Sequence, residues 1–542
     1  MGSFKAEDFD VLEFLSPDEH RERLVKRIAD TLSRCIRPLQ RAAREEDEQH
    51  LQETQETTSN QIQQWADLIY SSMNNKRRAY HDVTHAFPVS SEMKLPNDDQ
   101  HEQDAIPILS ALFHDVVYLT IDKQLSPQQA ELLKDEVEII QDRDQQVPPT
   151  NASTTPESST TIRYKIPYKD PLVRMAMSIF PSGEHQPPPP NEANEYLSAL
   201  ITVKCLGKTL SNKQLCHLIA CIEASIPFRG PLPVVGDSTT INDSTTPAMA
   251  RLFERLTKTN QTFCVGMAQD ELVKAVQGAA YFANNDLMSF RSEDVLLFRY
   301  SSWSLIYEWT PALLENTRFQ DILGGIHHLY KGYQKIPVDL IFQSFQGVPN
   351  VQTIEEMKQA ALANLTVVGK YATVRLLAAL LVDDVLSVAL GSDDHGDNTY
   401  ETILDSECEG GAVTFWKNVE EQFSTKETNH IGTPTLKEDK DTSEALQRCF
   451  QTQLPWIARR RWDAKNTRLS NALYVEMDWD NIVQCIEMAD TAQDQPIDLP
   501  KGSILKRVPS KVLRELGRVM SESLPSDYQR SIHKVTSVSS SG

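Results

Sequence analysis

Residues 78–85 read RAYHDVTH and residues 111–118 read ALFHDVVY. Together the two segments supply three imidazoles and a carboxylate that suit one divalent metal ion: His81, His85, His114 and Asp115. His81 and His85 are four residues apart, so on a helix they lie on one face. Imidazole and carboxylate groups are suitable ligands for first-row divalent metals. The two segments therefore predict a metal site.

The adjacent pair His114–Asp115 lies in a predicted buried helix over residues 104–118. An ordinary helical surface cannot aim two adjacent side chains the same way, but both can reach one ion if the helix end places them against a cleft. A further ligand should come from far along the chain, and the best candidate is Asp286. It follows an apolar helical pattern over residues 272–283. Asn-Asn-Asp is a costly end for such a helix unless the aspartate has another role.

These segments resemble the HD superfamily of metal-dependent phosphohydrolases, in which a His, a His-Asp doublet and a distant Asp hold the metal. The resemblance extends over about residues 60–300 and implies a helical HD core. It implies that the metal ligands are His85, His114, Asp115 and Asp286, and that Asp115 could bridge to a second ion. The implied cofactor is a divalent ion, with Mn, Mg, Fe, Co and Zn all open.

The stretch Tyr80-His81-x-x-x-His85 is also similar to cyclic-nucleotide phosphodiesterases, in which the earlier His protonates the leaving oxygen. This likeness implies that His81 is a general acid and not a ligand. The chain departs from that pattern because the phosphodiesterase histidine a few residues after the doublet is absent. Asp82 also stands where similar, uncharacterised HD proteins have Asn.

Residues 214–230 read QLCHLIACIEASIPFRG and resemble a Glu-x-Thr-Ile-Pro-Phe stretch of the same uncharacterised proteins. The resemblance suggests that Glu223 could support a ligand or position water. Arg78 and Arg229 could hold a phosphate, since a guanidinium fork matches phosphate oxygens. The alternative is that both arginines make structural salt bridges.

The chain has 542 residues and a formal net charge of −22. Such a surface repels nucleic acid and anionic membranes, so neither partner is expected. No apolar run approaches the length of a membrane span, and no leader segment precedes the first helix. The eight cysteines include no Cys-x-x-Cys pair, which is typical of a reduced, intracellular chain. We expect a cytoplasmic protein, with the nucleus as the alternative.

The hydrophobic pattern is helical almost throughout and predicts an all-α protein, with one helix running from residue 126 to residue 140. The polar segments 143–162 and 235–247 have too few apolar residues to pack and predict disordered inserts. The expected organisation has three parts: an HD-type domain over 1–300, a C-terminal helical region over 301–525 and a flexible tail over 526–542.

Three classes of function are compatible with these residues. In the first, metal-bound hydroxide hydrolyses a small phosphorylated metabolite or nucleotide, and the basic run 76–78 before the first motif favours local capture of its phosphate. The second is a di-iron oxygenase, whose family pattern wants two more histidines before Asp286; only His185 and His217 lie there. The third is a non-catalytic scaffold or regulator, which should have lost a ligand, and none is lost. We predict the phosphohydrolase.

Overall fold

The structure, a computed structural model, divides into two compact units. The first comprises residues 1–288 and 337–358, and the second comprises residues 289–336 and 359–542. The chain therefore changes unit at residue 288, near the predicted boundary at 300, whereas the return of residues 337–358 to the first unit was not predicted. The described residues are 17–46, 58–75, 77–83, 85–87, 102–141, 160–229, 247–309, 318–391, 399–424, 440–452, 467–489 and 501–538.

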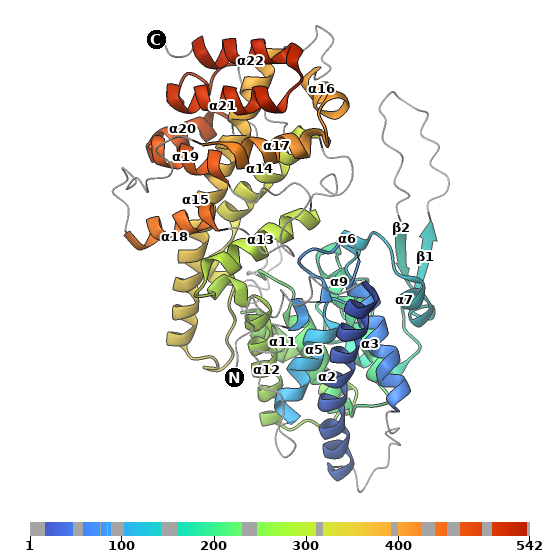
Figure 1. The fold of residues 1–542 in the computed structure, drawn as a ribbon. Coiled ribbons are helices and arrows are strands. Elements are labelled where there is room, and N and C mark those ends of the chain that lie inside the picture. Colours follow the sequence, from blue (N-terminus) through green and yellow to red (C-terminus); the bar gives the residue numbers. More distant parts are fainter. Residues whose placement is uncertain are drawn as a thin grey trace, which may run out of the picture. The chain divides into compact units, whose positions relative to one another are not determined.

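The first unit is built from helices and one small sheet (Figure 1). Its elements are α2 (Pro17–Glu46), α3 (Ser59–Met73), α5 (Glu102–Phe113), α6 (Leu119–Asp122), α7 (Pro127–Leu132), β1 (Val137–Gln141), β2 (Thr160–Tyr164), α8 (Pro171–Met177), η2 (Pro190–Glu192), α9 (Ala193–Leu206), α10 (Asn212–Ala224), α11 (Ala248–Thr262), α12 (Gln269–Asp286) and η5 (Val338–Leu340). Since the described elements of both units are helices apart from this two-stranded sheet, the all-α prediction is confirmed.

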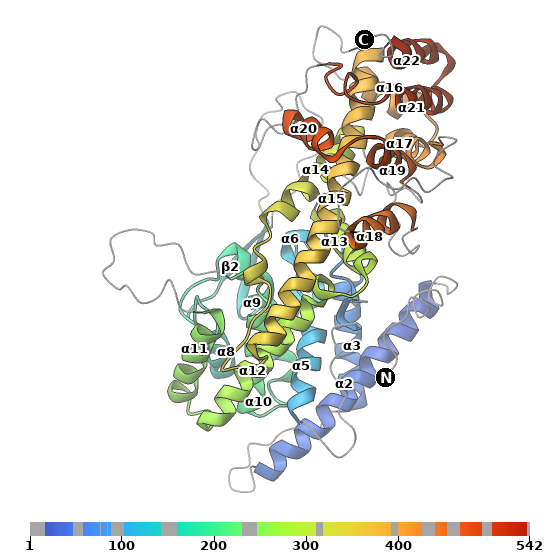
Figure 2. The same ribbon diagram turned by 90° about the vertical axis from the view of Figure 1, so that its left-hand side faces the viewer.

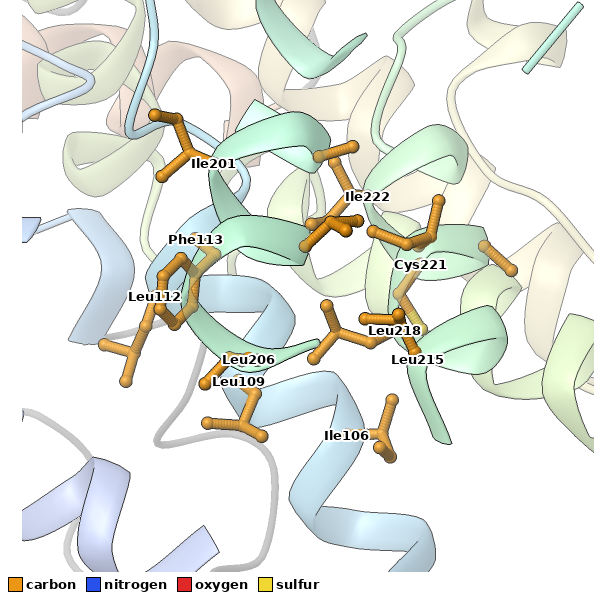
Figure 3. Packing of buried hydrophobic residues seen from close by; sticks show 14 of the residues in the cluster. Ile106, Leu109, Leu112, Phe113, Ile201, Leu206, Leu215, Leu218, Cys221 and Ile222 are labelled. Atoms are coloured by element: carbon orange, nitrogen blue, oxygen red, sulfur yellow. The ribbon is translucent and has the colours of Figure 1, made fainter. Parts of the chain in front are cut away.

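The centre of the first unit is an apolar core between α5, α9 and α10. Figure 3 shows Leu112 and Phe113 from the end of α5 against side chains of α9 and α10. Both residues are fully buried, as are Ile201 and Leu218 from the facing helices. Each buried side chain of this size contributes about 1.5–3 kcal/mol. This packing holds the end of α5, and with it the segment that follows, in one place.

Three helices of the first unit begin with the same local signal, a Ser or Thr N-cap with Gln three residues later. The N-caps are Thr58, Ser126 and Ser211, and in each case the capping side chain accepts the amide of that Gln. The Gln side chain in turn accepts the amide of the N-cap, so two free helix-end donors are satisfied. The sequence marks these starts because the interaction is local.

Two helix ends differ from the prediction. The helix expected over 104–118 ends at Phe113, so the doublet lies in a turn just after α5. The helix expected from 126 to 140 ends at Leu132. Residues 137–141 instead form β1, which pairs antiparallel with β2, and Ile139 faces Ile162. The pairing partner lies beyond the insert at 143–162, so a local pattern could not reveal the hairpin.

The second unit is entirely helical among its described residues (Figure 2). Its helices are η3 (Met288–Arg291, starting at the unit boundary), α13 (Val295–Trp309), α14 (Phe319–Lys335), α15 (Val351–Leu390, whose first turns belong to the first unit), α16 (Thr399–Glu407), α17 (Gly411–Gln422), α18 (Lys440–Gln451), α19 (Arg468–Glu476), α20 (Trp479–Ala489), α21 (Ser510–Ser523) and α22 (Ser526–Val538).

The expected flexible tail over 526–542 is for the most part helix α22, which packs beside α21. Ile532 and Thr536 of α22 are buried there, which explains why a polar-looking tail forms a helix. The expected inserts at 143–162 and 235–247 lie outside the described residues except for 160–162 and 247. None of the described helices has both the length and the apolar composition needed to cross a bilayer.

Candidate metal centre

Three separate parts of the first unit bring their side chains to one point. His85 lies in the short segment 85–87, His114 and Asp115 lie in the turn after α5, and Asp286 is the last residue of α12. The pair of helices α5 and α12 is in direct contact, and both pack on α10. The fold thus joins His85 to Asp286, which is 201 residues away in the chain.

The ligand atoms of His85, His114 and Asp286 all lie within 4.8 Å of one another. Asp286 Oδ1 is 3.2 Å from His85 Nε2 and 3.1 Å from His114 Nε2. Asp115 stands beside this group, with its Oδ2 3.0 Å from His114 Nε2. The four residues that the family resemblance implied as ligands are therefore neighbours, with Asp115 at the edge of the closest three.

The hydrogen-bond partner of His114 Nδ1 determines the tautomer of the ring. Nδ1 lies 3.1 Å from the carbonyl oxygen of Ala111, and a nitrogen there must donate its hydrogen. In the neutral ring, Nε2 then carries a lone pair directed at the two carboxylates. His114 Nε2 and Asp115 Oδ2 are both buried and, although they lie 3.0 Å apart, neither makes a hydrogen bond of acceptable geometry within the described residues. A lone pair facing carboxylate oxygens is repulsive unless a cation stands among them, so the donor set fits a metal ion.

Without a metal ion, the electrostatics of the cluster favour a proton on His114 at the point where a cation would otherwise stand. Burial by itself would lower the pKa of His114, but the carboxylates of Asp115 and Asp286 raise it well above its usual value. Burial would also raise the pKa of Asp115, yet the charges of His114 and His81 lower it to about 2. The pKa of Asp286 is lowered as well, because His114 and His85 outweigh its burial. The cluster thus holds its carboxylates ionised, which a metal ligand requires.

The buried side chain of Arg78 forms hydrogen bonds within the protein. Its Nε and Nη2 donate to both oxygens of Asp122 in α6, and its Nη1 lies 2.5 Å from the carbonyl oxygen of Asp115. The side chain has no exposed surface. These contacts match the structural alternative, in which Arg78 ties the first motif to the turn after α5. Lys76, the other end of the basic run, lies outside the described residues.

His81 lies next to the centre without belonging to the closest group. Its ring centroid is 5.8 Å from that of His85, and it stacks on Tyr118 at 4.3 Å. The shared helix face expected for His81 and His85 is not formed, because residues 79–82 are a bend. The charge of His81 nevertheless reaches Asp115 and lowers its pKa. This position at the rim is compatible with the predicted proton donor.

Glu223, at the end of α10, is fully buried and held by two arginines. Oε1 accepts from Arg229 Nη1 and, at 2.5 Å, from Arg255 Nη2; Oε2 accepts from Arg229 Nη2 at 3.1 Å. Arg255 also donates from Nε to the carbonyl of Ile179 at 2.7 Å. With donors on both carboxylate oxygens, Glu223 is placed to hold Arg229 and Arg255 together, and the water-positioning role predicted for it has no direct support.

Arg229 lines a small, partly open pocket of the first unit. Phe228, Leu340 and Gln343 also line it. The α12 wall is made by Ala283 and Leu287, which flank Asp286 in the sequence. This pocket is therefore next to the end of α12 that carries a candidate ligand.

Sequence reasoning missed Glu195, in the first turn of α9. Glu195 is 9% exposed, and its Oε2 is buried without a hydrogen-bond partner among the described residues. Its neighbours Asn194 and Ser198 accept the amides of Leu119 and Val117, just after the doublet. The available signal was the set of polar residues at 194, 195 and 198 at the start of an otherwise apolar helix.

The two histidines that an oxygenase would need are elsewhere. His185 is 73% exposed and lies 3.6 Å from Glu184. His217 packs against α12, where a Cβ atom placed on Gly278 would lie 2.5 Å from its Nε2. Burial lowers the pKa of His217 to about 4. Neither histidine belongs to the group of His85, His114 and Asp286.

Comparison of the chain with models of protein families, with curated proteins and with solved structures finds no match.

Proposed function

We propose that this protein is a metal-dependent phosphohydrolase that acts on a small phosphorylated metabolite or nucleotide. The observation that carries the proposal is the convergence of His85, His114 and Asp286, whose ligand atoms lie within 4.8 Å of one another. The unpartnered atoms His114 Nε2 and Asp115 Oδ2 beside them give an independent reason for a cation at this point. The resemblance of both motifs to the HD superfamily supplies the reaction class.

The donor set limits the choice of ion. Two imidazoles with carboxylates favour a first-row transition ion such as Zn or Fe over Mg, which prefers oxygen ligands alone. A bound divalent ion would lower the pKa of a water molecule and polarise a phosphoryl oxygen.

Residues of the chain would supply the proton for the leaving group and the positive charge that binds the substrate. His81, at the rim, would give a proton to the leaving oxygen. Arg229 and Arg255 bring two positive charges against the single carboxylate of Glu223, and Arg229 lines the adjacent pocket. Arg229 would meet an anionic group of the substrate in this pocket.

The overall charge of the chain supports a small substrate over a polymer. A net charge of −22 disfavours long-range attraction of DNA or RNA, whose binding relies on many phosphate contacts. A metabolite with one or two phosphates needs only local cations. We therefore propose a mononucleotide or phosphorylated metabolite and no nucleic-acid partner.

The test uses the full chain, stripped with a chelator and reloaded with Mn²⁺, Co²⁺, Zn²⁺, Fe²⁺ or Mg²⁺ in separate samples. Phosphate release is measured from p-nitrophenyl phosphate, nucleoside monophosphates and sugar phosphates. The proposal expects metal-dependent release from at least one small substrate and none from Asp286→Ala. A chain that binds metal in full stoichiometry and hydrolyses no phosphate ester would contradict it.

A further inference from the structure

The first unit contains two buried glutamates near the candidate centre with opposite surroundings. Glu223 has donors on both oxygens. Glu195 has an Oε2 that is buried and lacks a hydrogen-bond partner within the described part of the chain. A buried carboxylate oxygen without a donor is unfavourable for folding alone. Glu195 is therefore a carboxylate whose environment calls for a partner from outside the chain.

The first turn of α9, which carries Glu195, is attached to the segment that follows the doublet. Asn194 Oδ1 accepts the amide of Leu119 at 2.9 Å, and Ser198 Oγ accepts the amide of Val117 at 3.0 Å. These bonds come from the residue before Glu195 and from the residue one helical turn after it. The segment that follows His114–Asp115 is thus attached to α9 on both sides of Glu195.

The charges that act on Glu195 come from two further segments. Asp115 and His114 act from the turn after α5, Arg229 acts from the segment after α10, and the amide of Glu195 itself donates a hydrogen bond. Glu195 therefore lies within electrostatic reach of both the candidate metal ligands and the arginine that lines the pocket. Burial dominates these influences and raises the pKa of Glu195 to about 7.

We propose that Glu195 is a catalytic residue that accepts a proton from the water molecule that attacks the substrate phosphorus, an inference that rests on the proposed function. The water transfers one proton to Oε2 of Glu195 while its oxygen forms a bond to phosphorus. The bond between phosphorus and the leaving oxygen breaks, and that oxygen takes a proton from His81. Glu195 then releases its proton and His81 regains one, so a single water is consumed.

The neighbouring carboxylates are less suited to this role. Glu223 is neutralised by Arg229 and Arg255, and Asp115 has a pKa of about 2 and stands against His114. Glu192, three residues before Glu195, also has a buried Oε2 without a partner among the described residues. The charges that act on Glu192 are those of Glu223, Arg229 and Arg255, and not those of the doublet. Glu192 is therefore the matched control.

The experiment compares Glu195→Gln with Glu192→Gln in the full-length, Mn²⁺-loaded protein. Both substitutions keep the shape of a buried glutamate and remove its charge. Metal content and the rise in melting temperature on metal addition are measured first. The kcat and KM for p-nitrophenyl phosphate, and the dependence of kcat on pH, are measured next.

We expect Glu195→Gln to keep its metal and its KM, and to lose about 100-fold or more in kcat. The fall of kcat toward acid pH, which reports the base, should flatten in this variant. Glu192→Gln should match the wild type in every measurement. If Glu195→Gln fails to fold, Glu195→Asp replaces it. The aspartate carboxylate lies farther from the site because the side chain is shorter, so we expect kcat to fall about tenfold or more with the metal retained.

Loss of metal from Glu195→Gln would make Glu195 a ligand and overturn the inference, as would an unchanged kcat in either Glu195 variant. An equal loss in Glu192→Gln would overturn it too, since any buried charge at this turn would then suffice. A wild-type protein that binds Mn²⁺ but releases no phosphate would overturn the proposed function, and the role of Glu195 with it. An active wild type with an unaffected variant overturns the role of Glu195 alone.

Discussion

The candidate metal centre of the first unit and the buried Arg375–Glu420 pair of the second unit both remove carboxylates from water. Glu420 is fully buried and accepts from Arg375 Nη1 at 3.0 Å and from Ser470 Oγ at 2.6 Å. The Arg375 guanidinium lies over the rings of Trp303 and Trp416. At the candidate metal centre, Asp115 Oδ2 is buried beside His114, and Glu195 Oε2 is buried with no hydrogen-bond donor among the described residues.

This difference separates two uses of a buried charge. A carboxylate surrounded by donors of its own chain is compensated in the folded state, and removing one partner is strongly unfavourable. A carboxylate without such donors is compensated only when a cation or a reacting group arrives. The first kind of site should therefore affect stability, and the second should affect binding and turnover.

The largest expected effect is the loss of metal in Asp286→Ala. Asp286 Oδ1 lies within 3.2 Å of both imidazoles, and residues that merely orient a ligand already cost 10–100-fold in affinity when replaced. We expect a loss beyond about 100-fold in metal affinity, with the helical circular dichroism spectrum unchanged. Equilibrium dialysis with metal analysis measures it. Full occupancy in the variant would remove Asp286 from the site.

Glu420→Ala should show the opposite pattern. The substitution leaves Arg375 buried without its carboxylate, which is expected to cost about 3–5 kcal/mol of folding free energy. Urea unfolding followed by tryptophan fluorescence measures the loss, because Trp303 and Trp416 pack on this arginine. The double replacement Arg375→Met with Glu420→Leu should lose less. Metal content should stay at the wild-type value, and a drop in it would break the comparison.

His81→Ala tests the proton donor at the rim of the centre. We expect the variant to retain its metal and to lose about 100-fold in kcat, which corresponds to about 2.7 kcal/mol. The loss should be larger for alkyl phosphates than for p-nitrophenyl phosphate, since only the poor leaving group needs the proton. Equal losses for both substrates would argue against an acid role, and lost metal would make His81 a ligand.

The two glutamates whose pKa is raised to about 7, Glu195 and Glu401, should respond differently to pH. A raised pKa in the folded state means that Glu195 favours folding below its unfolded pKa of 4.5, and that this contribution is lost as the pH rises through about 7. In the metal-free protein, Glu195→Gln should therefore gain stability relative to the wild type, by about 2 kcal/mol between pH 5 and pH 8.

Glu401 is the control for that measurement, because its carboxylate accepts the amides of Phe319 and Gln320 at the start of α14. Glu401→Gln keeps only one acceptor oxygen, so it should lose one of these bonds and be less stable than the wild type at both pH values. Thermal melts at pH 5 and pH 8 measure the stability of the two variants relative to the wild type. A pH-independent effect of Glu195→Gln would show that its carboxylate is compensated after all.

The smallest effect is expected at Arg518, whose exposed side chain pairs with Glu515 and Glu522 on α21. Solvent screens such pairs, so Arg518→Ala should change the folding free energy by about 1 kcal/mol or less. The same urea experiment used for Glu420→Ala gives the value. A loss as large as that of Glu420→Ala would remove the distinction between buried and exposed pairs.

Residue type and local pattern marked the histidines, Asp115 and Asp286 as candidates in the sequence, and the resemblance to the HD superfamily implied the choice of His85 over His81. His114 and Asp115 follow an apolar helix, and Asp286 ends another, and the structure brings all three together with His85. Helix starts such as Ser211 were readable for the same reason, since the capping interaction spans three residues.

What the sequence did not reveal depends on contacts between distant segments. The sequence did not reveal the contacts of Arg78 with Asp122 and of Glu223 with Arg255. Glu195 was missed because its position relative to Asp115 arises only when α9 packs on the turn after α5. The β1–β2 pairing joins residues on both sides of an insert. In each case the structural role of a residue depends on a contact with a distant segment, which the local sequence does not show.

The most direct test of the central claim is anomalous X-ray diffraction from crystals of the wild-type protein grown with Zn²⁺ or Mn²⁺. We predict one strong anomalous peak among His85 Nε2, His114 Nε2 and Asp286 Oδ1, about 2.0–2.2 Å from each, with Asp115 next to it. A metal-loaded crystal with no anomalous density among these three atoms, or with the ion bound by other residues, would contradict the account.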